Sequence, residues 1–306
     1  AEGVLCLLPF LHFFGKEAHS MPFDYDAPIY YPPYENRSIL IPASYGCPHN
    51  QCAFCSMYKD TPYREVSLLD IKQSIREVSE YRPCSERVFL LGGQSFCLKA
   101  DKLKEILRYI RERLPLCEAV SMYASIRSVA DKTDADLAEL KALGLGKLYI
   151  GVESGCDEIL EEMHKGHTGE EAARQLKRLN QAGIPFHSII MYGIGGRGRG
   201  IQNALATANV LNQVESVAIV PMCLTIMPST ELERRVHSGE FEEANFAELL
   251  LELRTLLENL DLNTPTPFAT DHATNRFLVA GTLPQDKEKM VSQLDQMLKR
   301  FGMELH

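Results

Sequence analysis

Six short apolar segments alternate with amphipathic helical patterns between residues 38 and 224, and this alternation constrains the fold more than any other feature of the chain. Several of these segments are almost continuously hydrophobic, as strands buried on both faces are. Six consecutive β-then-α units predict a parallel sheet with helical crossovers. A doubly wound sheet and a six-stranded partial barrel both satisfy this pattern. The expected strands are Ser38–Ala43, Arg87–Leu91, Ala119–Ile126, Lys147–Glu153, Phe186–Tyr192 and Ser216–Leu224.

Capping and turn residues indicate where several helices begin and end, and the pattern changes after the sixth strand. A capping box at Thr168–Glu171 predicts a helix that runs to the Ala182–Gly183 stop. After the sixth strand, the pattern predicts a helix over 246–260, a proline-rich turn over 264–267, an irregular segment, and a last helix from about Gln285. We therefore divide the chain into an N-terminal extension (1–37), an α/β region (38–230) and a helical C-terminal extension (231–306).

The apolar stretch from Val4 to Phe14 is too short to span a membrane and is interrupted by Pro9. It lacks the basic region and the small-residue cleavage site of a signal peptide. The sequence resembles a protein that begins at Met21, so residues 1–20 are expected to be non-native or disordered, and no membrane span is expected.

Charge and cysteine usage narrow the class of protein. The net charge of −9 argues against a broad nucleic-acid surface, which requires a basic stripe. The nine cysteines are an odd number, and only three of them cluster. This distribution favours reduced thiols in the cytoplasm over the disulfide framework of a secreted protein.

The three clustered cysteines, Cys47, Cys52 and Cys55, follow the first expected strand directly. In an α/β sheet or barrel this loop lies at the carboxyl ends of the strands, where active sites form. Three thiolates within nine residues can hold a soft metal or an iron–sulfur cluster. A cluster with three protein ligands leaves one iron open to a small molecule. The alternative is a structural zinc ion bound by the three cysteines and His49.

The cysteine loop, with Phe54 just before its last cysteine, resembles the cluster loop of the radical S-adenosylmethionine (SAM) superfamily. The usual spacing there is Cys-x3-Cys-x2-Cys, whereas this chain has Cys-x4-Cys-x2-Cys. The resemblance implies a partial (β/α)6 TIM-like barrel with a helical C-terminal extension. It also implies one 4Fe-4S cluster on Cys47, Cys52 and Cys55, whose reduction cleaves SAM to a 5′-deoxyadenosyl radical. The segment from Met163 to Glu170 is similar to the coproporphyrinogen-oxidase-like and methylthiotransferase-like members.

Further motifs follow in the order that the resemblance leads us to expect. Gly92, Gly93 and Gln94 follow the second strand, where relatives bind the amino group of SAM, and two glycines let backbone carbonyls approach it. Gln94 stands where relatives carry an acid. Glu153 ends the fourth strand and resembles the acid that binds the ribose hydroxyls.

The remaining cofactor candidates also come from the resemblance. Gly195 lies in the glycine-rich stretch after the fifth strand, which in relatives packs against adenine. Arg174, in the helix that starts at Thr168, is the candidate for the SAM carboxylate. Arg127, just past the third strand, is the alternative for the same role.

The sequence does not identify the substrate, for which we expect a small molecule or a peptide. An external reductant such as flavodoxin or ferredoxin would supply electrons. The alternatives are a non-enzymatic zinc- or iron–sulfur-binding protein and a radical SAM enzyme that modifies RNA. The weak catalytic candidates are His272, Asn275 and Cys97, and the weak substrate-binding candidates are Arg197, Arg199 and Asp271.

Overall fold

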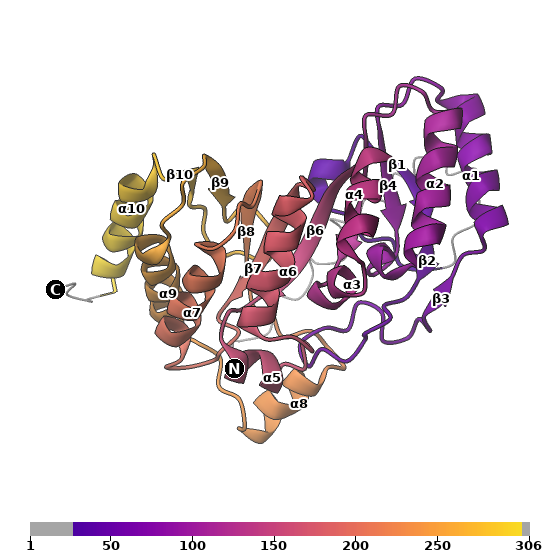
Figure 1. Ribbon diagram of the computed structural model, residues 1–306. Helices are drawn as coiled ribbons and strands as arrows, with labels where there is room; N and C mark the ends of the chain where they lie inside the picture. The colour runs from indigo at the N-terminus through magenta and orange to yellow at the C-terminus, as the bar shows by residue number, and fades with distance from the viewer. Residues whose placement is uncertain (1–26, 302–306) are drawn as a thin grey trace.

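The computed structural model describes residues 27–301, so the expectation for residues 1–20 lies outside the described part. Six parallel strands form the centre of the sheet, each paired with the next along the chain. All six expected strands are confirmed, and the fold is a partial (β/α)6 TIM-like barrel (Figure 1). These strands are β1 (Ile39–Pro42), β4 (Arg87–Leu91), β5 (Ala119–Ala124), β6 (Leu145–Glu153), β7 (Phe186–Tyr192) and β8 (Ala218–Cys223).

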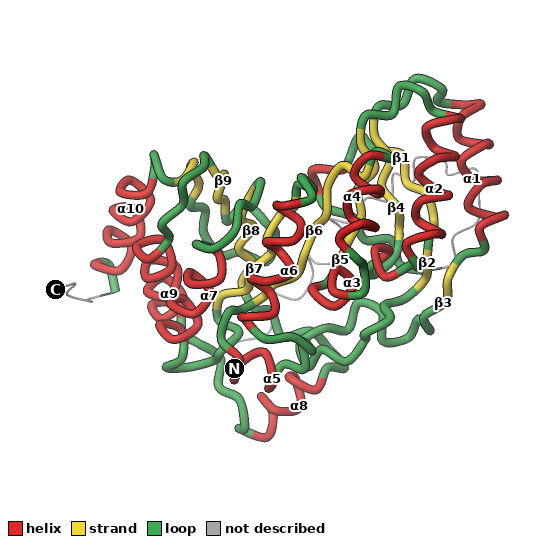
Figure 2. Tube along the Cα trace, viewed as in Figure 1, coloured by secondary structure: helices red, strands yellow, loops and turns green. Residues whose placement is uncertain are grey.

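Helices follow the strands and cover one face of the curved sheet (Figure 2). Alternate strand residues such as Leu90 and Ile150 point into the core that these helices complete. Thr168 caps α6 as expected, because its hydroxyl accepts from the N–H of Glu171 at 3.1 Å. The helices are α1 (Leu68–Tyr81), α2 (Ala100–Arg113), α3 (Ile126–Ala130), α4 (Asp134–Ala142), α5 (Asp157–Glu162), α6 (Gly169–Gln181), α7 (Gly200–Leu211), α8 (Glu231–Ser238), α9 (Phe246–Asn259) and α10 (Lys287–Lys299), with 3₁₀ turns η1 (Pro33–Glu35) and η2 (Ser95–Cys97).

The tail extends the sheet, which corrects the prediction of a turn and an irregular segment between the last two helices. Strand β9 (Thr266–Ala269) pairs with β8 in parallel, and β10 (Ala280–Leu283) pairs with β9 in antiparallel fashion. Phe268 is 1% exposed and fixes β9 against the core. A proline lacks the N–H that a sheet needs, so Pro267 conceals this short strand from pattern analysis.

The segment before β1 covers part of the inner face of the sheet. Ile29 and Tyr31 pack against the cluster of Phe89 and Tyr149, which point away from the helices. The side chain of Glu35 is fully buried beside them. Among the described residues, no helix combines the length and the apolar character needed to cross a membrane.

Glu35 is the centre of a buried polar group. Its carboxylate accepts from the hydroxyl of Tyr149 at 2.6 Å and from the hydroxyl of Ser38, and it pairs with Arg87 at 3.2 Å. Each partner comes from a different part of the sheet or from the chain next to it. Glu35 therefore fixes the N-terminal segment to the inner face.

Replacement of Glu35 with alanine is expected to lower the free energy of unfolding by about 2 kcal/mol or more, because two buried hydroxyls lose their acceptor. Urea unfolding followed by circular dichroism measures this loss. Tyr149→Phe removes one of the hydrogen bonds and is expected to cost about 1 kcal/mol. An equal loss in both variants would contradict a central role for Glu35.

Candidate active site

A short antiparallel ribbon closes the base of the cysteine loop. Strand β2 (Ser44–Tyr45) pairs with β3 (Arg64–Glu65), so the residues between them form a closed loop beyond the carboxyl end of β1. Gly46 opens this loop with a φ of +67°, and a Cβ there would lie 2.5 Å from the carbonyl oxygen of Thr61. Only glycine fits this position without strain.

The loop carries Cys47, Cys52 and Cys55, and Cys47 lies close enough to the other two to influence their pKa values. Burial raises the pKa of Cys55 to about 11 and also raises the pKa of Cys52, and the neighbouring thiols add to both shifts. The metal-free thiols of Cys52 and Cys55 therefore stay protonated near neutral pH, and metal binding at these two residues would release protons. A soft donor set of three neighbouring, partly buried sulfurs is suited to an iron–sulfur cluster.

The loop that follows β4 lies directly against the first cysteine. A Cβ on Gly93 would be 2.7 Å from the carbonyl oxygen of Gly46 and 2.9 Å from Cβ of Cys47, so this close approach requires glycine. The amide nitrogen of Gln94 lies 3.6 Å from Sγ of Cys47, and its carbonyl oxygen accepts from the hydroxyl of Ser125 at 2.6 Å. The structure thus brings these predicted cofactor residues together with Cys47.

Phe54 turns into a separate apolar cluster below the loop, where it packs with Ile159 and Met163. The backbone of the preceding residue, Ala53, makes hydrogen bonds through both its N–H and its carbonyl group. The N–H of Ala53 donates to the carbonyl of Met163 at 3.0 Å, and the carbonyl of Ala53 accepts from the N–H of Leu232 at 2.9 Å. Helices α5 and α8 therefore fix the half of the loop that carries the last two cysteines.

Lys165 is a site residue that sequence reasoning missed. Its ammonium lies 3.2 Å from Oε1 of Glu153, and the two side chains are only 11% and 10% exposed. Burial disfavours the charged form of Lys165, but the charges of Glu153, Cys52 and Cys55 outweigh this effect and raise its pKa. The cysteine loop therefore has a buried cation beside it.

Glu153 lies at the end of β6, as expected, in a left-handed conformation with a φ of +62°. Its carboxylate folds back over the strand, because a Cβ on Gly151 would lie 2.3 Å from its Oε1. Glycine at position 151 therefore leaves the space that the carboxylate occupies. The pair of Glu153 and Lys165 places one anion and one cation at the mouth of the barrel.

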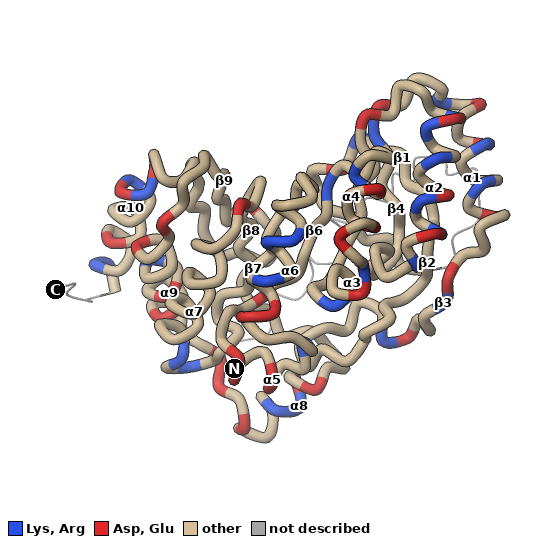
Figure 3. Tube along the Cα trace, in the orientation of Figure 1, with Lys and Arg blue, Asp and Glu red and all other residues tan. Residues whose placement is uncertain are grey.

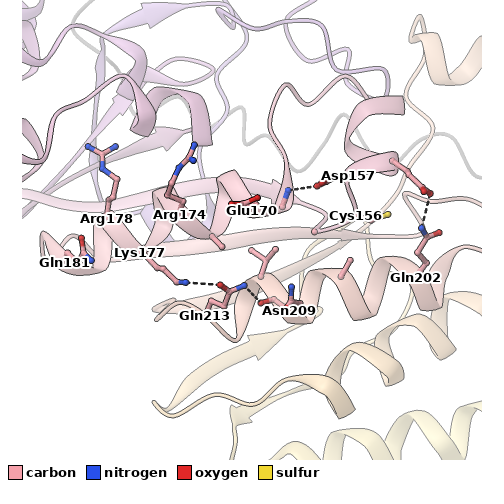
Figure 4. A pocket seen from close by; sticks show the side chains of 16 residues that line it. Cys156, Asp157, Glu170, Arg174, Lys177, Arg178, Gln181, Gln202, Asn209 and Gln213 are labelled. Atoms are coloured by element: carbon pink, nitrogen blue, oxygen red, sulfur yellow. Dashed lines mark hydrogen bonds between the residues drawn. The ribbon is translucent and has the colours of Figure 1, made fainter.

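The two arginine candidates lie in different places. Arg174 is exposed on α6, in a groove of about 780 Å³ between α6 and α7 on the outer face (Figure 4). Arg127 lies beside the cysteine loop: a Cβ on Gly166 would be 3.2 Å from His49 and 3.6 Å from Arg127. The structure therefore brings Arg127 to the loop and leaves Arg174 on the outer surface.

His49, the fourth ligand in the zinc alternative, already makes a hydrogen bond to another part of the chain. Its Nε2 lies 2.6 Å from the carbonyl oxygen of His164, which can only accept, so Nε2 is the donor. Burial lowers the pKa of His49, and the charges of Lys165 and Arg127 act in the same direction. Among residues 27–301, no three His, Cys, Asp or Glu side chains converge as ligands of a single ion do.

The glycine-rich loop after β7 packs closely on its neighbours. A Cβ on Gly195 would lie 2.9 Å from the side chain of Ile159. The two arginines in this loop are paired with acids: Arg197 with Glu242, and Arg199 with Glu162 at 2.7 Å. Both positive charges are therefore balanced within the described part of the chain, and Figure 3 shows acidic and basic residues interspersed over the structure.

The tail candidates are held mainly by contacts within the protein. Oδ1 of Asn275 accepts from the hydroxyl of Tyr192 at 2.9 Å and from the N–H of Cys223 at 2.8 Å, and its Nδ2 donates to the carbonyl of Pro221. Asn275 thus ties the tail to the ends of β7 and β8, a structural role. In the same tail, His272 contacts Thr274, and Asp271 is exposed. Cys97 lies outside the tail, in η2, and its sulfur is 3.1 Å from the hydroxyl of Tyr63.

A model of the radical SAM superfamily matches residues 41–205, over half of the chain. The chain belongs to the radical SAM superfamily. It is therefore an enzyme that uses a 4Fe-4S cluster and SAM. The matched residues include the cysteine loop, Glu153 and Lys165, and the glycine-rich loop.

Relatives within the radical SAM superfamily differ widely in sequence and length. The "Uncharacterized protein MJ0486" of Methanocaldococcus jannaschii is 23% identical over 84% of this chain and 82% of its own length. Heme chaperone HemW of Bacillus subtilis is 23% identical over 56% of this chain and 46% of its own length. This chain therefore spans about half the length of HemW.

Solved structures show the same fold at low sequence identity. Methylornithine synthase (PylB) superposes with a TM-score of 0.51 and 16% identity, over 88% of this chain and 82% of its own. The methyltransferase TsrM from Kitasatospora setae superposes with a TM-score of 0.54 and 16% identity, over 66% of this chain and 39% of its own. Likeness at this identity supports the radical SAM fold.

Proposed function

We propose that Cys47, Cys52 and Cys55 hold the 4Fe-4S cluster and that the enzyme generates a 5′-deoxyadenosyl radical, which abstracts hydrogen from a small-molecule or peptide substrate. The observation that carries this proposal is the position of the three cysteines in one closed loop, beside the buried pair of Lys165 and Glu153. When bound, the cluster supplies the electron that breaks the C5′–S bond of SAM.

The residues around the loop match the charged groups of SAM. Lys165 is a buried cation beside the cysteines and would bind the carboxylate, in place of Arg174 on the outer surface. The carbonyl groups near Gly92 and Gly93 would accept from the amino group, with the side-chain oxygen of Gln94, which also accepts from Ser125, as a further acceptor. The role of Arg127 would be to add positive charge next to His49.

The nucleoside part of SAM would lie along the ends of β6 and β7. Glu153 would accept hydrogen bonds from the ribose hydroxyls, and the loop at Gly195 would pack against adenine. Phe54 and its apolar neighbours would exclude water from the side of the loop that faces α5. The weak substrate candidates Arg197, Arg199 and Asp271 contribute no role to this proposal, nor does the weak catalytic candidate His272.

We further propose that flavodoxin or ferredoxin donates the electron, in the reduced environment of the cytoplasm. All eight cysteines of the described part are free thiols, which agrees with that setting. Residues 38–230 would form the catalytic barrel, and residues 231–306 would support its mouth through α8 and α9.

The test is anaerobic reconstitution of the protein, reduction with dithionite and addition of SAM. Iron content, the visible charge-transfer band and 5′-deoxyadenosine measured by mass spectrometry are the readouts. We expect about four irons per chain and release of 5′-deoxyadenosine that depends on SAM and reductant. Zinc in place of iron, or a full cluster whose electron paramagnetic resonance (EPR) spectrum does not respond to SAM, would overturn the proposal.

A further inference from the structure

A buried carboxylate on α9 lies beneath the glycine-rich loop that follows β7. Glu252 is 2% exposed. Its Oε2 accepts from the N–H of Gly193 at 2.9 Å, and its Oε1 accepts from the side-chain amide of Asn203 at 2.6 Å. Burying a carboxylate at this depth is costly unless hydrogen bonds replace its contacts with water. Both oxygens of Glu252 hold groups that lie next to the mouth of the barrel.

The hydrogen bonds continue from Asn203 to the loop that follows β6. Oδ1 of Asn203 accepts from the hydroxyl of Ser154, and the oxygen of that hydroxyl accepts from the N–H of Cys156 at 2.9 Å. Ser154 directly follows Glu153 in the chain. One continuous chain of hydrogen bonds therefore runs from Gly193 through Glu252 and Asn203 to the residue beside Glu153.

The geometry requires a carboxylate at this point. Both neighbours of Glu252 are donors, so a neutral amide would direct its own NH₂ toward one of them. The side-chain amide of Asn203 cannot flip to present its oxygen to that NH₂, because its own NH₂ also donates to the carbonyl of Met191 at 3.1 Å. A Cβ on Gly200 would lie 2.9 Å from Oε2 of Glu252, so there is little space for the side chain to move.

We propose that Glu252 is a positioning residue for SAM: it holds the loops after β6 and β7 at the spacing that the ribose and adenine require. This inference rests on the roles proposed above for Glu153 and Gly195. Glu252 itself touches loop backbone and Asn203, and so acts through them. The C-terminal part of the chain would thereby determine how tightly the barrel binds its cosubstrate.

The ionisation of Glu252 gives a second readout. Burial raises its pKa to about 7, although its two hydrogen bonds oppose the shift. Protonation would replace one acceptor with an O–H donor, and one of the two bonds would be lost. The other titratable groups that face it are Glu248 on α9, and Tyr192 and Cys223 at the strand ends. Burial raises the pKa of Cys223 to about 11 and that of Tyr192 further, so neither titrates near pH 7.

The experiment compares SAM binding by the reconstituted wild-type enzyme and by Glu252→Gln. Binding is followed by the EPR spectrum of the reduced cluster during SAM titration, at pH 6 and pH 8. We expect the variant to keep its iron, and its dissociation constant for SAM at pH 8 to rise at least tenfold. The wild-type constant should rise several-fold from pH 8 to pH 6, and the variant's should not. Glu258→Gln, on an exposed part of the same helix, is the matched control and should match the wild type.

A Glu252→Gln enzyme with wild-type affinity and the wild-type pH dependence would overturn the inference while the proposed function stands. Failure of the wild-type enzyme to bind SAM would overturn both. If Glu252→Gln does not fold or loses its iron, Ser154→Ala decides, because it breaks the same chain of hydrogen bonds at its other end. We expect that variant to raise the dissociation constant about threefold, and an unchanged constant would count against the inference.

Discussion

Cys52→Ala is expected to abolish the formation of 5′-deoxyadenosine. Cys52 lies between the other two cysteines in the sequence, and the structure holds its flank rigidly through Ala53. With two thiolates left, a 4Fe-4S cluster loses one of the three protein ligands on which it depends. We expect iron content to fall well below the wild-type value and SAM cleavage to fall by at least about 1,000-fold. Iron analysis and mass spectrometry of the reconstituted variant measure both.

Cys84→Ala is the matched control, because Cys84 is an exposed free thiol on the turn after α1. It should keep wild-type iron content and activity. If Cys52→Ala retained a full cluster and cleaved SAM, another residue would have to be the ligand. If both variants lost iron equally, the loss would reflect general thiol damage.

Lys165→Met is expected to raise the dissociation constant for SAM roughly 100-fold, the effect of losing one charge-assisted hydrogen bond of about 1.5–3 kcal/mol. Methionine keeps the length and apolar stem of lysine but has no charge. The change also leaves Glu153 buried without its ion-pair partner, so the protein should unfold at a lower urea concentration. SAM titration followed by EPR, together with urea unfolding, separates the two effects.

Lys165→Arg keeps the charge and is expected to retain most of the affinity for SAM. Iron content should be close to wild type in both variants, because lysine is not a cluster ligand. A dissociation constant within threefold of wild type for Lys165→Met would assign the SAM carboxylate to another cation beside the loop, such as Arg127. Arg174→Met should leave SAM binding unchanged, since Arg174 lies on the outer surface.

The central strands could be predicted from the sequence because both of their faces are buried. Ile150 and Phe186 are fully buried and belong to short, largely apolar segments, the pattern of strands that are buried on both faces. Strand β9 could not be predicted, because its burial depends mainly on Phe268 while Pro267 gives the signal of a turn. Pattern analysis therefore recovers the barrel and misses the strands that the tail adds to it.

The site likewise contains residues that could be predicted from the sequence and residues that could not. The cysteine loop could be found because its ligands are close in the sequence. Lys165 could not, because a single lysine between helices is normally solvated, and only the folded chain places it against Glu153 and Cys52. Glu252 was hidden for the same reason, since its partner Gly193 is far away in the sequence.

The unusual spacing of the cysteines has a structural location. Asn50 takes a left-handed conformation with a φ of +43°, and its amide donates to the carbonyl of Tyr58 while its own carbonyl accepts from Lys59. The four-residue spacer thus turns upon itself, with hydrogen bonds supplied from within the loop. The spacer therefore holds its additional residue without displacing Cys52 or Cys55, because α5 and α8 hold that half of the loop. The extra residue thus alters the turn between the first two cysteines, while the contacts with α5 and α8 continue to place the last two.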